Sequence, residues 1–128
     1  MQKRLLLSVR HIVFIFAGLS FSFTSQVAEA REHRLLIINS YNEAAPWSQE
    51  LITPIALLTA RTDGVRADII HMNGTFIRNE SMYRQVENGI FQRFEDPKPD
   101  YLVLIGNMSF TLRERIVKEW GDIPMVLI

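Results

Sequence analysis

The sequence predicts an α/β fold in which a parallel sheet of four strands, in the order 2-1-3-4, lies between two layers of helices. The main observation is Pro99–Gly106, where five apolar residues follow a Pro-Asp pair and end at a glycine. A short run of this kind, rich in β-branched and aromatic residues, is typical of a strand buried on both faces. Similar runs occur at Leu35–Ile38 and Met125–Ile128. Helical patterns separate the three runs, which predicts a sheet covered by helices on both sides.

The first thirty residues show the three parts of a secretory signal. They contain a basic start at Lys3, Arg4 and Arg10, an apolar run of twelve residues at Ile12–Phe23, and the small-x-small motif Ala28–Ala30. We expect export to the periplasm with cleavage after the last residue of that motif. The alternative is an uncleaved signal that stays as a membrane anchor, although a spanning helix needs about 20 apolar residues.

Residues 31–128 form the predicted domain, and their composition limits the classes of partner. Without the three basic residues and one acidic residue of the signal, 11 basic and 13 acidic residues remain, so the formal net charge is −2. A chain without a basic excess does not favour binding to nucleic acid or to an anionic membrane surface. The sequence contains no cysteine, which excludes thiol catalysis, thiolate metal sites and disulfides.

The first predicted strand and the helix after it are separated by a loop rich in turn formers. The strand is Arg34–Asn39 and the loop is Ser40–Trp47. The helix has two compatible starts: Ser48 as N-cap with Pro54 inside the helix, or Thr53 as N-cap with Pro54 in the first position. Its predicted buried face consists of four residues at helical spacing, Leu51, Ile52, Ile55 and Leu58.

The second strand is predicted at Val65–Met72, after Gly64, which suits the left-handed position at the end of the preceding helix. The strand carries Arg66, Asp68 and His71, and an edge strand tolerates such polarity because one of its sides is less enclosed. With this strand at an edge, right-handed crossovers and short connections favour the strand order 2-1-3-4. The first and third strands are then central neighbours, and a crevice opens between them where the chain changes direction.

Two further helices precede the last strand. Asn79 is the predicted N-cap of a helix that ends near Phe94. Its predicted buried stripe is Met82, Tyr83, Val86, Ile90, Phe91 and Phe94. Ser109 is the predicted N-cap of the next helix, which ends at Gly121. The predicted buried face of that helix is Leu112, Ile116, Val117 and Trp120.

The last predicted strand, Ile123–Ile128, is strongly apolar. A strand of this kind normally has a neighbour and cover on both faces. We therefore interpret the chain as the front part of a longer protein or as a truncated product. We also expect low stability, or self-association through the open edge, because a four-stranded domain of this length is marginal in size.

Motifs for several chemistries are missing. The loop after the first strand has neither G-x-G-x-x-G nor G-x-x-x-x-G-K, and the chain has no G-x-S-x-G elbow. His33 and His71 lack the spacing of zinc ligands, and Asp68 and His71 point to opposite faces of a strand. We therefore expect no catalytic residue, no metal and no cofactor.

Polar and aromatic residues instead follow each of the first three strands. Sites in open parallel sheets lie beyond the carboxyl ends of the strands. Amides and hydroxyls orient a polar ligand, and aromatic rings stack on rings or sugars. The candidate ligand-binding residues are Ser40, Tyr41, Asn42, Trp47, Asn73, Thr75, Gly106, Asn107 and Ser109. Each alone is also explained by loop, turn or helix-cap chemistry, but the set together indicates a crevice for an unknown small molecule.

Three segments resemble the first lobe of periplasmic-binding-protein-like domains. They are R-L-L-I-I-N-S-Y-N-E-A-A-P-W-S (34–48), K-P-D-Y-L-V-L-I-G-N (98–107) and G-D-I-P-M-V-L-I (121–128). They are most similar to extracytoplasmic sensor regions of hybrid two-component histidine kinases, and to the related ABC-transporter substrate-binding proteins. The resemblance covers most of residues 34–128, and N-S-Y with the following P-W is its most specific part.

The resemblance implies two α/β lobes that are joined by a hinge and close on a small ligand. By position, the residues that match cleft-facing loops are Ser40, Tyr41, Trp47, Asn107 and Ser109. Gly106-Asn107 stands where an acidic loop often occurs in the family, so the resemblance leaves the ligand class open.

The expected function is that of a non-enzymatic, extracytoplasmic ligand-sensing domain of a two-component sensor histidine kinase, truncated and without the kinase, with residues 31–128 as a partial first lobe. Its partners would be a small-molecule ligand and a second lobe of the same parent chain. A membrane anchor would come only from an uncleaved signal or from a part of the parent outside this chain. The alternatives are a soluble solute-binding protein of a transporter, a small flavodoxin-like enzyme that uses the same crevice, and a non-functional fragment.

Overall fold

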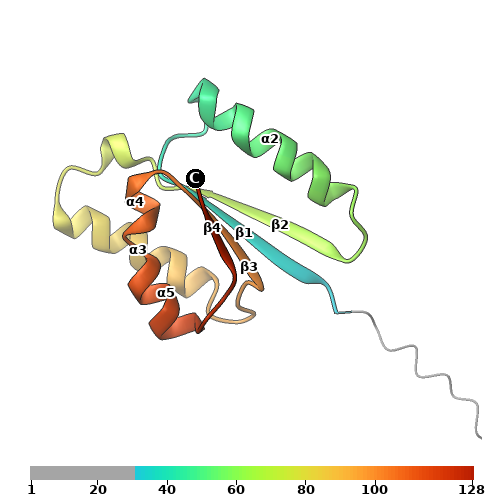
Figure 1. Cartoon of the computed structure of the whole chain (residues 1–128). Coiled ribbons are helices and arrows are strands. Elements are labelled where there is room, and N and C mark those ends of the chain that lie inside the picture. The colour runs from blue at the N-terminus through green and yellow to red at the C-terminus, as the bar shows by residue number, and fades with distance from the viewer. Residues whose placement is uncertain (1–30) are drawn as a thin grey trace, which may run out of the picture.

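Four parallel strands form the central sheet in a computed structural model that describes residues 31–128 (Figure 1). They are β1 (His33–Asn39), β2 (Val65–His71), β3 (Tyr101–Ile105) and β4 (Met125–Leu127). Their order is β2-β1-β3-β4, so the predicted fold class and strand order are confirmed. The predicted signal sequence, residues 1–30, lies outside the described residues.

The two central strands supply the most buried residues. Leu36 pairs with Leu102 and Ile38 pairs with Leu104, and all four side chains are at most 1% exposed. The edge strand β2 is only half-buried, and its Asp68 forms an ion pair of 3.3 Å with Arg34 of β1. The polarity that predicted an edge position for β2 is therefore accommodated by a cross-strand charge pair.

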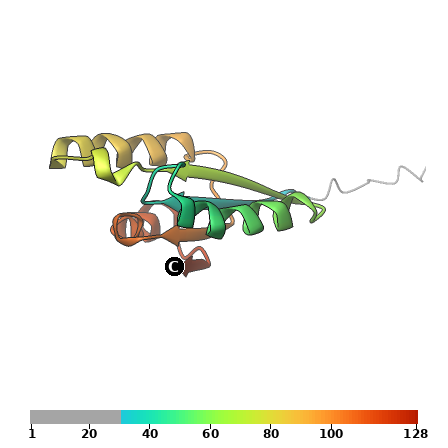
Figure 2. The ribbon, with the colours of Figure 1, turned by 90° about the horizontal axis from the view of Figure 1, so that it is seen from above.

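The two faces of the sheet are covered unequally. Helix α2 (Pro46–Ala60) lies on one face, whereas α3 (Glu80–Arg93), α4 (Asn107–Phe110) and α5 (Arg113–Trp120) lie on the other (Figures 1 and 2). Right-handed crossovers explain this division, because the chain moves from β1 to β2 in one direction and from β2 to β3 and β4 in the opposite direction. The larger core cluster therefore lies under α3 and α5, and the smaller cluster lies under α2.

Helix α2 begins earlier than predicted. Ala45 is its N-cap and Pro46 lies in the first turn, where the missing N–H of proline is not needed. Both predicted N-caps are therefore wrong, and Pro54 lies inside the helix. Ser48 is buried and accepts a hydrogen bond of 2.5 Å from Asn39 Nδ2.

The buried face of α2 also differs from the prediction. Ile52 is buried, and Leu51 and Ile55 are partly buried against the same core cluster, as predicted. Leu58, in contrast, is 68% exposed, and the other buried residues of the helix are Ser48 and Thr59. Ser48 and Thr59 therefore lie on the face of α2 that is turned toward the sheet, and Leu58 lies on the face that is turned away from it. Gly64 does not follow the helix directly, because Arg61 is the C-cap. It has a φ of 73°, and its carbonyl accepts a hydrogen bond from His33 N.

The helices on the other face follow the prediction in part. Asn79 caps α3 as predicted, since its Oδ1 accepts a hydrogen bond from Met82 N at 2.9 Å. Gly121 ends α5 with a φ of 91°. The predicted cap role of Ser109 is wrong, because this residue lies inside the short helix α4. Met82 of α3 and Val117 of α5 are 37% and 48% exposed. The buried faces of these two helices are therefore narrower than predicted.

Strand β4 is not buried on both faces, which corrects the prediction for Met125–Ile128. Val126, Leu127 and Ile128 are 57%, 44% and 47% exposed. The reason is that, within residues 31–128, β4 pairs with β3 alone, and α2 packs on its face of the sheet toward β2, at the opposite edge. Self-association through this apolar edge stays a prediction. Within residues 31–128, no helix has the length and apolar character needed to cross a membrane.

Candidate functional site

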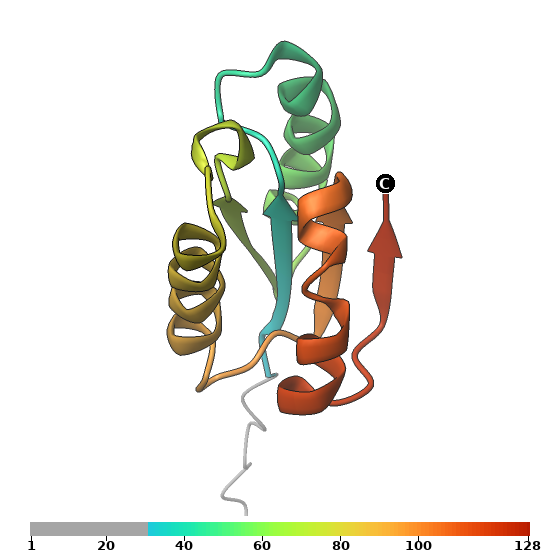
Figure 3. The same ribbon diagram turned by 90° about the vertical axis from the view of Figure 1, so that its left-hand side faces the viewer.

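A groove of about 1220 Å³ extends from the carboxyl ends of the strands into the space between α3 and α5. Figure 3 shows these two helices on either side of β1, with the loops after the strands gathered above them. The segments that directly follow β1, β2 and β3 supply Ser40, Tyr41, Gly74, Thr75, Asn107 and Met108, of which the last two are the first residues of α4. The helices and the turn between α4 and α5 supply Glu80, Tyr83, Arg84, Glu87, Asn88, Thr111, Glu114, Arg115, Lys118 and Glu119.

Four of the nine residues predicted from the sequence line this groove: Ser40, Tyr41, Thr75 and Asn107. They come from the loops after β1, β2 and β3, which meet because β1 lies between the other two strands. The other five do not line it, namely Asn42, Trp47, Asn73, Gly106 and Ser109. The structure therefore brings four of the nine predicted residues together in one groove, and the other five lie outside its lining.

Gly106 is the point where the loops after β1 and β3 touch. Its φ of 83° and ψ of 165° belong to a region that is essentially restricted to glycine. A Cβ atom at this position would overlap Cε2 of Tyr41 and would lie 3.0 Å from Cβ of Ser40. Gly106 thus serves the site by letting Tyr41 pack against the backbone.

Ser109 connects the same two loops through two hydrogen bonds. Its backbone N–H donates a hydrogen bond of 2.8 Å to Ser40 Oγ, and its own hydroxyl donates to the carbonyl of Gly106 at 2.8 Å. Ser109 is fully buried. Its hydrogen bonds are therefore directed to the loops, and Ser40 reaches the groove with its hydroxyl already engaged by α4.

The loop after β2 approaches Ser40 through Gly74. The Gly74 N–H donates a hydrogen bond of 2.8 Å to the Ser40 carbonyl, and an added Cβ would lie 2.8 Å from that oxygen and 3.1 Å from Met108 Sδ. Asn73, just before it, has a left-handed φ of 54° and is exposed. Glycine at position 74 therefore allows the loop after β2 to pack closely against the Ser40 carbonyl and the Met108 side chain.

Asn39, the last residue of β1, organises the Ser40–Tyr41 loop from the interior. This side chain is fully buried. Its Nδ2 donates to Ser48 Oγ at 2.5 Å and lies 3.0 Å from His71 Nδ1, and its Oδ1 accepts from Tyr41 N at 3.3 Å. The Asn39 amide nitrogen therefore lies within hydrogen-bond distance of both Ser48 and His71. His71 is thus part of the support of the loop.

The predicted aromatic residue Trp47 also supports the loop. Its ring packs edge-on against Tyr41, with centroids 4.2 Å apart and planes at 76°, a favoured geometry for aromatic pairs. Trp47 is 43% exposed and lies in the first turn of α2. Asn42 follows Tyr41, and its buried Oδ1 has no hydrogen-bond partner among the described residues.

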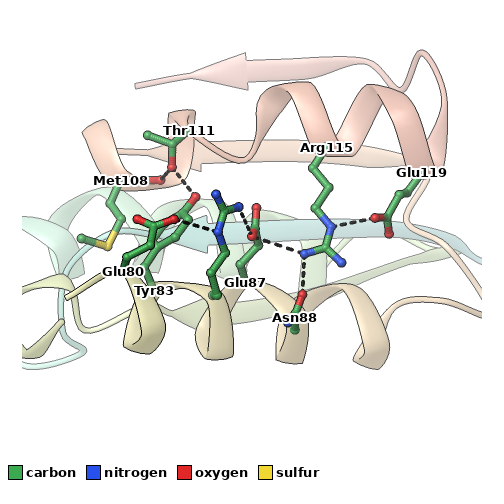
Figure 4. Close-up of polar contacts among 9 residues, drawn as sticks. Glu80, Tyr83, Glu87, Asn88, Met108, Thr111, Arg115 and Glu119 are labelled. Carbon is green, nitrogen blue, oxygen red and sulfur yellow. Dashed lines mark hydrogen bonds and ion pairs between the residues drawn. The ribbon is translucent and has the colours of Figure 1, made fainter. Parts of the chain in front are cut away.

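A polar network joins α3 to α5 along the groove (Figure 4). Glu87 is only 3% exposed, and its Oε2 pairs with Arg84 at 2.9 Å and with Arg115 at 3.3 Å. The hydrogen bond to Glu87 and the negative charges of Glu80 and Glu87 raise the pKa of the Arg84 guanidinium above its usual value. The buried carboxylate is therefore held between two arginines from two helices.

Arg115 is the most connected residue of this network. It donates to Asn88 Oδ1 at 2.6 Å and to Glu119 Oε1 at 2.7 Å. Its guanidinium also lies 4.3 Å from the centroid of the Phe91 ring, within the range of a cation–π contact. These contacts cover the aromatic core with a charged layer that faces the groove.

Tyr83 and Thr111 form a second bridge between the helices (Figure 4). Their hydroxyl oxygens lie 2.6 Å apart, and Thr111 Oγ1 donates to the Met108 carbonyl at 2.6 Å. Because the Thr111 hydrogen is used in this way, the Tyr83 hydroxyl donates to Thr111. The bridge holds α3 against the start of α5 next to the loop residues of the groove.

Sequence reasoning missed the helical part of the groove, although one signal was present. Glu87 lies four residues after Tyr83 and three before Ile90, on the predicted apolar stripe of the helix. A carboxylate on such a stripe is buried only when it has partners. Its partner Arg115 could not be named, because helical periodicity does not say which two helices will lie side by side.

Replacing Arg115 with glutamine should lower the free energy of unfolding by about 1–3 kcal/mol. The buried Glu87 carboxylate would then keep only Arg84 as an ionic partner, and an incompletely paired buried charge is costly. Urea unfolding of the full chain measures the effect. Arg113→Gln, an exposed change on the same helix, is the control and should stay within about 0.5 kcal/mol of the wild type. Equal effects of the two changes would contradict the role of the network.

The groove offers hydroxyls, an amide, aromatic rings and paired charges, which together suit reversible binding of a small molecule. Among residues 31–128, no group of three or more His, Cys, Asp or Glu residues could hold a metal ion. The fold and groove define a parallel α/β domain with a candidate binding site at the carboxyl edge of its sheet. Comparisons of the chain with family models, curated proteins and solved structures find no match.

Proposed function

We propose that residues 31–128 are a ligand-binding lobe of the extracytoplasmic sensor domain of a two-component histidine kinase. The observation that carries the proposal is that Ser40, Tyr41, Thr75 and Asn107 line one groove from the loops after three adjacent strands. This edge of an open parallel sheet, where the chain changes direction between β1 and β3, is where such folds bind ligands. The resemblance of residues 34–48 and 98–107 to sensor regions supports the kinase assignment.

In the proposed mechanism, the groove forms one wall of a cleft and a second lobe of the parent chain forms the other. A ligand held by both walls would shift an equilibrium between open and closed forms by its differential affinity for them. The exposed apolar edge of β4, with Val126 at 57% and Ile128 at 47%, supports the presence of a further neighbour in the parent. Closure would be passed on to a membrane segment and then to the kinase.

Ligand binding should depend on Thr75 and Asn107. We expect at least one member of a panel of sugars, amino acids, dicarboxylates and inorganic phosphate to raise the melting temperature of the full chain by several degrees, because binding to the native state alone stabilises it. The double variant Thr75→Ala/Asn107→Ala should lose this shift. Both side chains are exposed, so the melting temperature without ligand should stay within about 2 °C of the wild type.

Ser81→Ala is the matched control, since Ser81 is an exposed residue of α3 that does not line the groove. This variant should keep the ligand-induced shift in full. A shift that survives in the Thr75/Asn107 double variant would place the binding site elsewhere. If no member of the panel changes the melting temperature, the binding-lobe proposal itself is wrong.

The coding sequence after codon 128 tests the histidine-kinase part of the proposal. We expect it to encode a second α/β lobe, a membrane-spanning helix and a kinase. A second lobe followed by a stop codon would instead identify a solute-binding protein of a transporter, which uses the same kind of cleft. A stop codon directly after Ile128 would contradict the two-lobed mechanism for this product.

A further inference from the structure

We infer that the ligand of the groove is an uncharged molecule that carries hydroxyl groups and an apolar face, as a neutral sugar does. This inference rests on the proposed binding function and names the chemical class of the ligand. Three observations carry it: the pairing of the charges between α3 and α5, the neutral polar groups at the strand ends, and the apolar surfaces beside them.

Five of the charged side chains along the groove are paired with one another, whereas Glu114 and Lys118 of α5 line it without an ion pair among the described residues. Glu87 is held by Arg84 and Arg115, Arg84 also pairs with Glu80 at 2.8 Å, and Arg115 also pairs with Glu119 at 2.7 Å. An ionic ligand would have to replace one of these partners, and it would leave the displaced charge unpaired at a cost in free energy. The pairing of Glu80, Glu87 and Glu119 with Arg84 and Arg115 therefore disfavours a ligand with a net charge at this part of the groove.

Neutral groups dominate the part of the groove at the strand ends. Thr75 contributes a hydroxyl and Asn107 an amide, and both side chains are exposed to a ligand that enters the groove. Each of these groups can donate and accept a hydrogen bond. A ligand hydroxyl has the same double capacity, whereas a carboxylate can only accept and an ammonium can only donate. The pair therefore matches hydroxyl groups on the ligand.

Apolar surfaces lie beside these polar groups. The Tyr41 ring is held at the mouth of the groove by Trp47 and Gly106. Met108 contributes its side chain next to Gly74, and Tyr83 contributes its ring while its hydroxyl is engaged by Thr111. Aromatic rings of this kind pack on the C–H face of a sugar or on another ring. Hydroxyl and apolar recognition are thus combined in one groove.

Isothermal titration calorimetry of the full chain tests the inference with five probes. These are D-galactose, maltose, L-glutamate, succinate and inorganic phosphate. We expect heat of binding for at least one of the two sugars, and a Kd that changes by less than about twofold between 50 and 500 mM NaCl, because a neutral ligand is not screened by salt. Asn107→Ala should weaken that binding about tenfold or more, since it removes a hydrogen bond and leaves the ligand hydroxyl unpaired.

The outcomes separate the ligand class from the binding function. If a charged probe binds, weakens severalfold at high salt and depends on Asn107, the inference about the ligand class is overturned while the proposed binding function stands. If none of the probes binds in calorimetry and no compound of the wider panel shifts the melting temperature, both fail. If a sugar binds but Asn107→Ala leaves its Kd unchanged, the assignment of this class to the groove is wrong.

Discussion

Replacing Gly106 with alanine should lower the free energy of unfolding by about 3 kcal/mol or more. Two costs add at this position. The backbone conformation, with a φ of 83° and a ψ of 165°, costs about 1–3 kcal/mol for a residue with a Cβ. The new methyl group would also overlap the Tyr41 ring, and relief of such overpacking typically costs about 1–3 kcal/mol more.

Two other glycines separate these costs. Gly121 has a similar conformation, with a φ of 91°, but an added Cβ would have no neighbour within 4 Å; Gly121→Ala should therefore show only the backbone cost, about 1–3 kcal/mol. Gly89 lies in α3 with open space around it. Gly89→Ala should stabilise the domain by up to about 1 kcal/mol, because alanine is the better helix former.

Denaturant unfolding of the three variants of the full chain gives the comparison. The expected order of stability is Gly89→Ala, wild type, Gly121→Ala and, lowest, Gly106→Ala. If Gly106→Ala lowers the free energy of unfolding no more than Gly121→Ala does, the close contact between Tyr41 and Gly106 adds nothing to the cost of the substitution. Because the same contact holds Tyr41 at the mouth of the groove, Gly106→Ala should also weaken ligand binding, whereas Gly121→Ala should not.

Asn39→Leu should have the second large effect, a loss of about 3 kcal/mol in the free energy of unfolding. Leucine has the same number and branching of side-chain heavy atoms as asparagine but is bulkier and cannot hydrogen-bond, so Ser48 Oγ, His71 Nδ1 and the Tyr41 N–H lose their shared partner. A buried polar group left without a partner costs about 1–3 kcal/mol. The measurement is again unfolding in urea, with Asn107→Ala at an exposed position as the control within about 0.5 kcal/mol.

A double-mutant cycle shows whether the Asn39–Ser48 hydrogen bond is responsible. Ser48→Ala removes the buried acceptor, so Asn39→Leu in that background should cost less than it does alone. We expect the two losses to fall short of additivity by about 1 kcal/mol. Strict additivity would mean that the loss in Asn39→Leu comes from packing or from the contacts to His71 and Tyr41.

The strands were predictable because their signals are local. The apolar run Tyr101–Ile105 ends at a glycine and forms β3 with the predicted bounds. The polar residues of β2 placed it at an edge, and from that position the strand order followed. Asn79 was predictable as a cap because its side-chain Oδ1 accepts a hydrogen bond from the N–H of Met82, three positions later, so its partner lies in the same short segment.

The predictions that are wrong concern residues whose position depends on segments far away in the sequence. Ser109 has the chemistry of an N-cap, but its N–H bonds to Ser40, 69 positions away in the sequence. Ser48 likewise is one of the two N-caps that the sequence predicts for the first helix, but it is bonded to Asn39 in the core. Leu58 was assigned to the core because its spacing fits, although only the tilt and rotation of α2 on the sheet decide which side of a helix is covered.

The sequence by itself determined the alternation of strands and helices, the edge position of β2 and the group of loops that meet at the carboxyl ends of the strands. These features follow from short-range patterns of apolar and polar residues and from the handedness of the crossovers. Only the tertiary structure decided which loop residues line the groove and that Glu87 of α3 is buried and pairs with Arg115 of α5. The physical reason is that two successive crossovers place α3 and α5 side by side. The buried carboxylate of Glu87 on α3 is then stable because the guanidinium of Arg115 on α5 pairs with it.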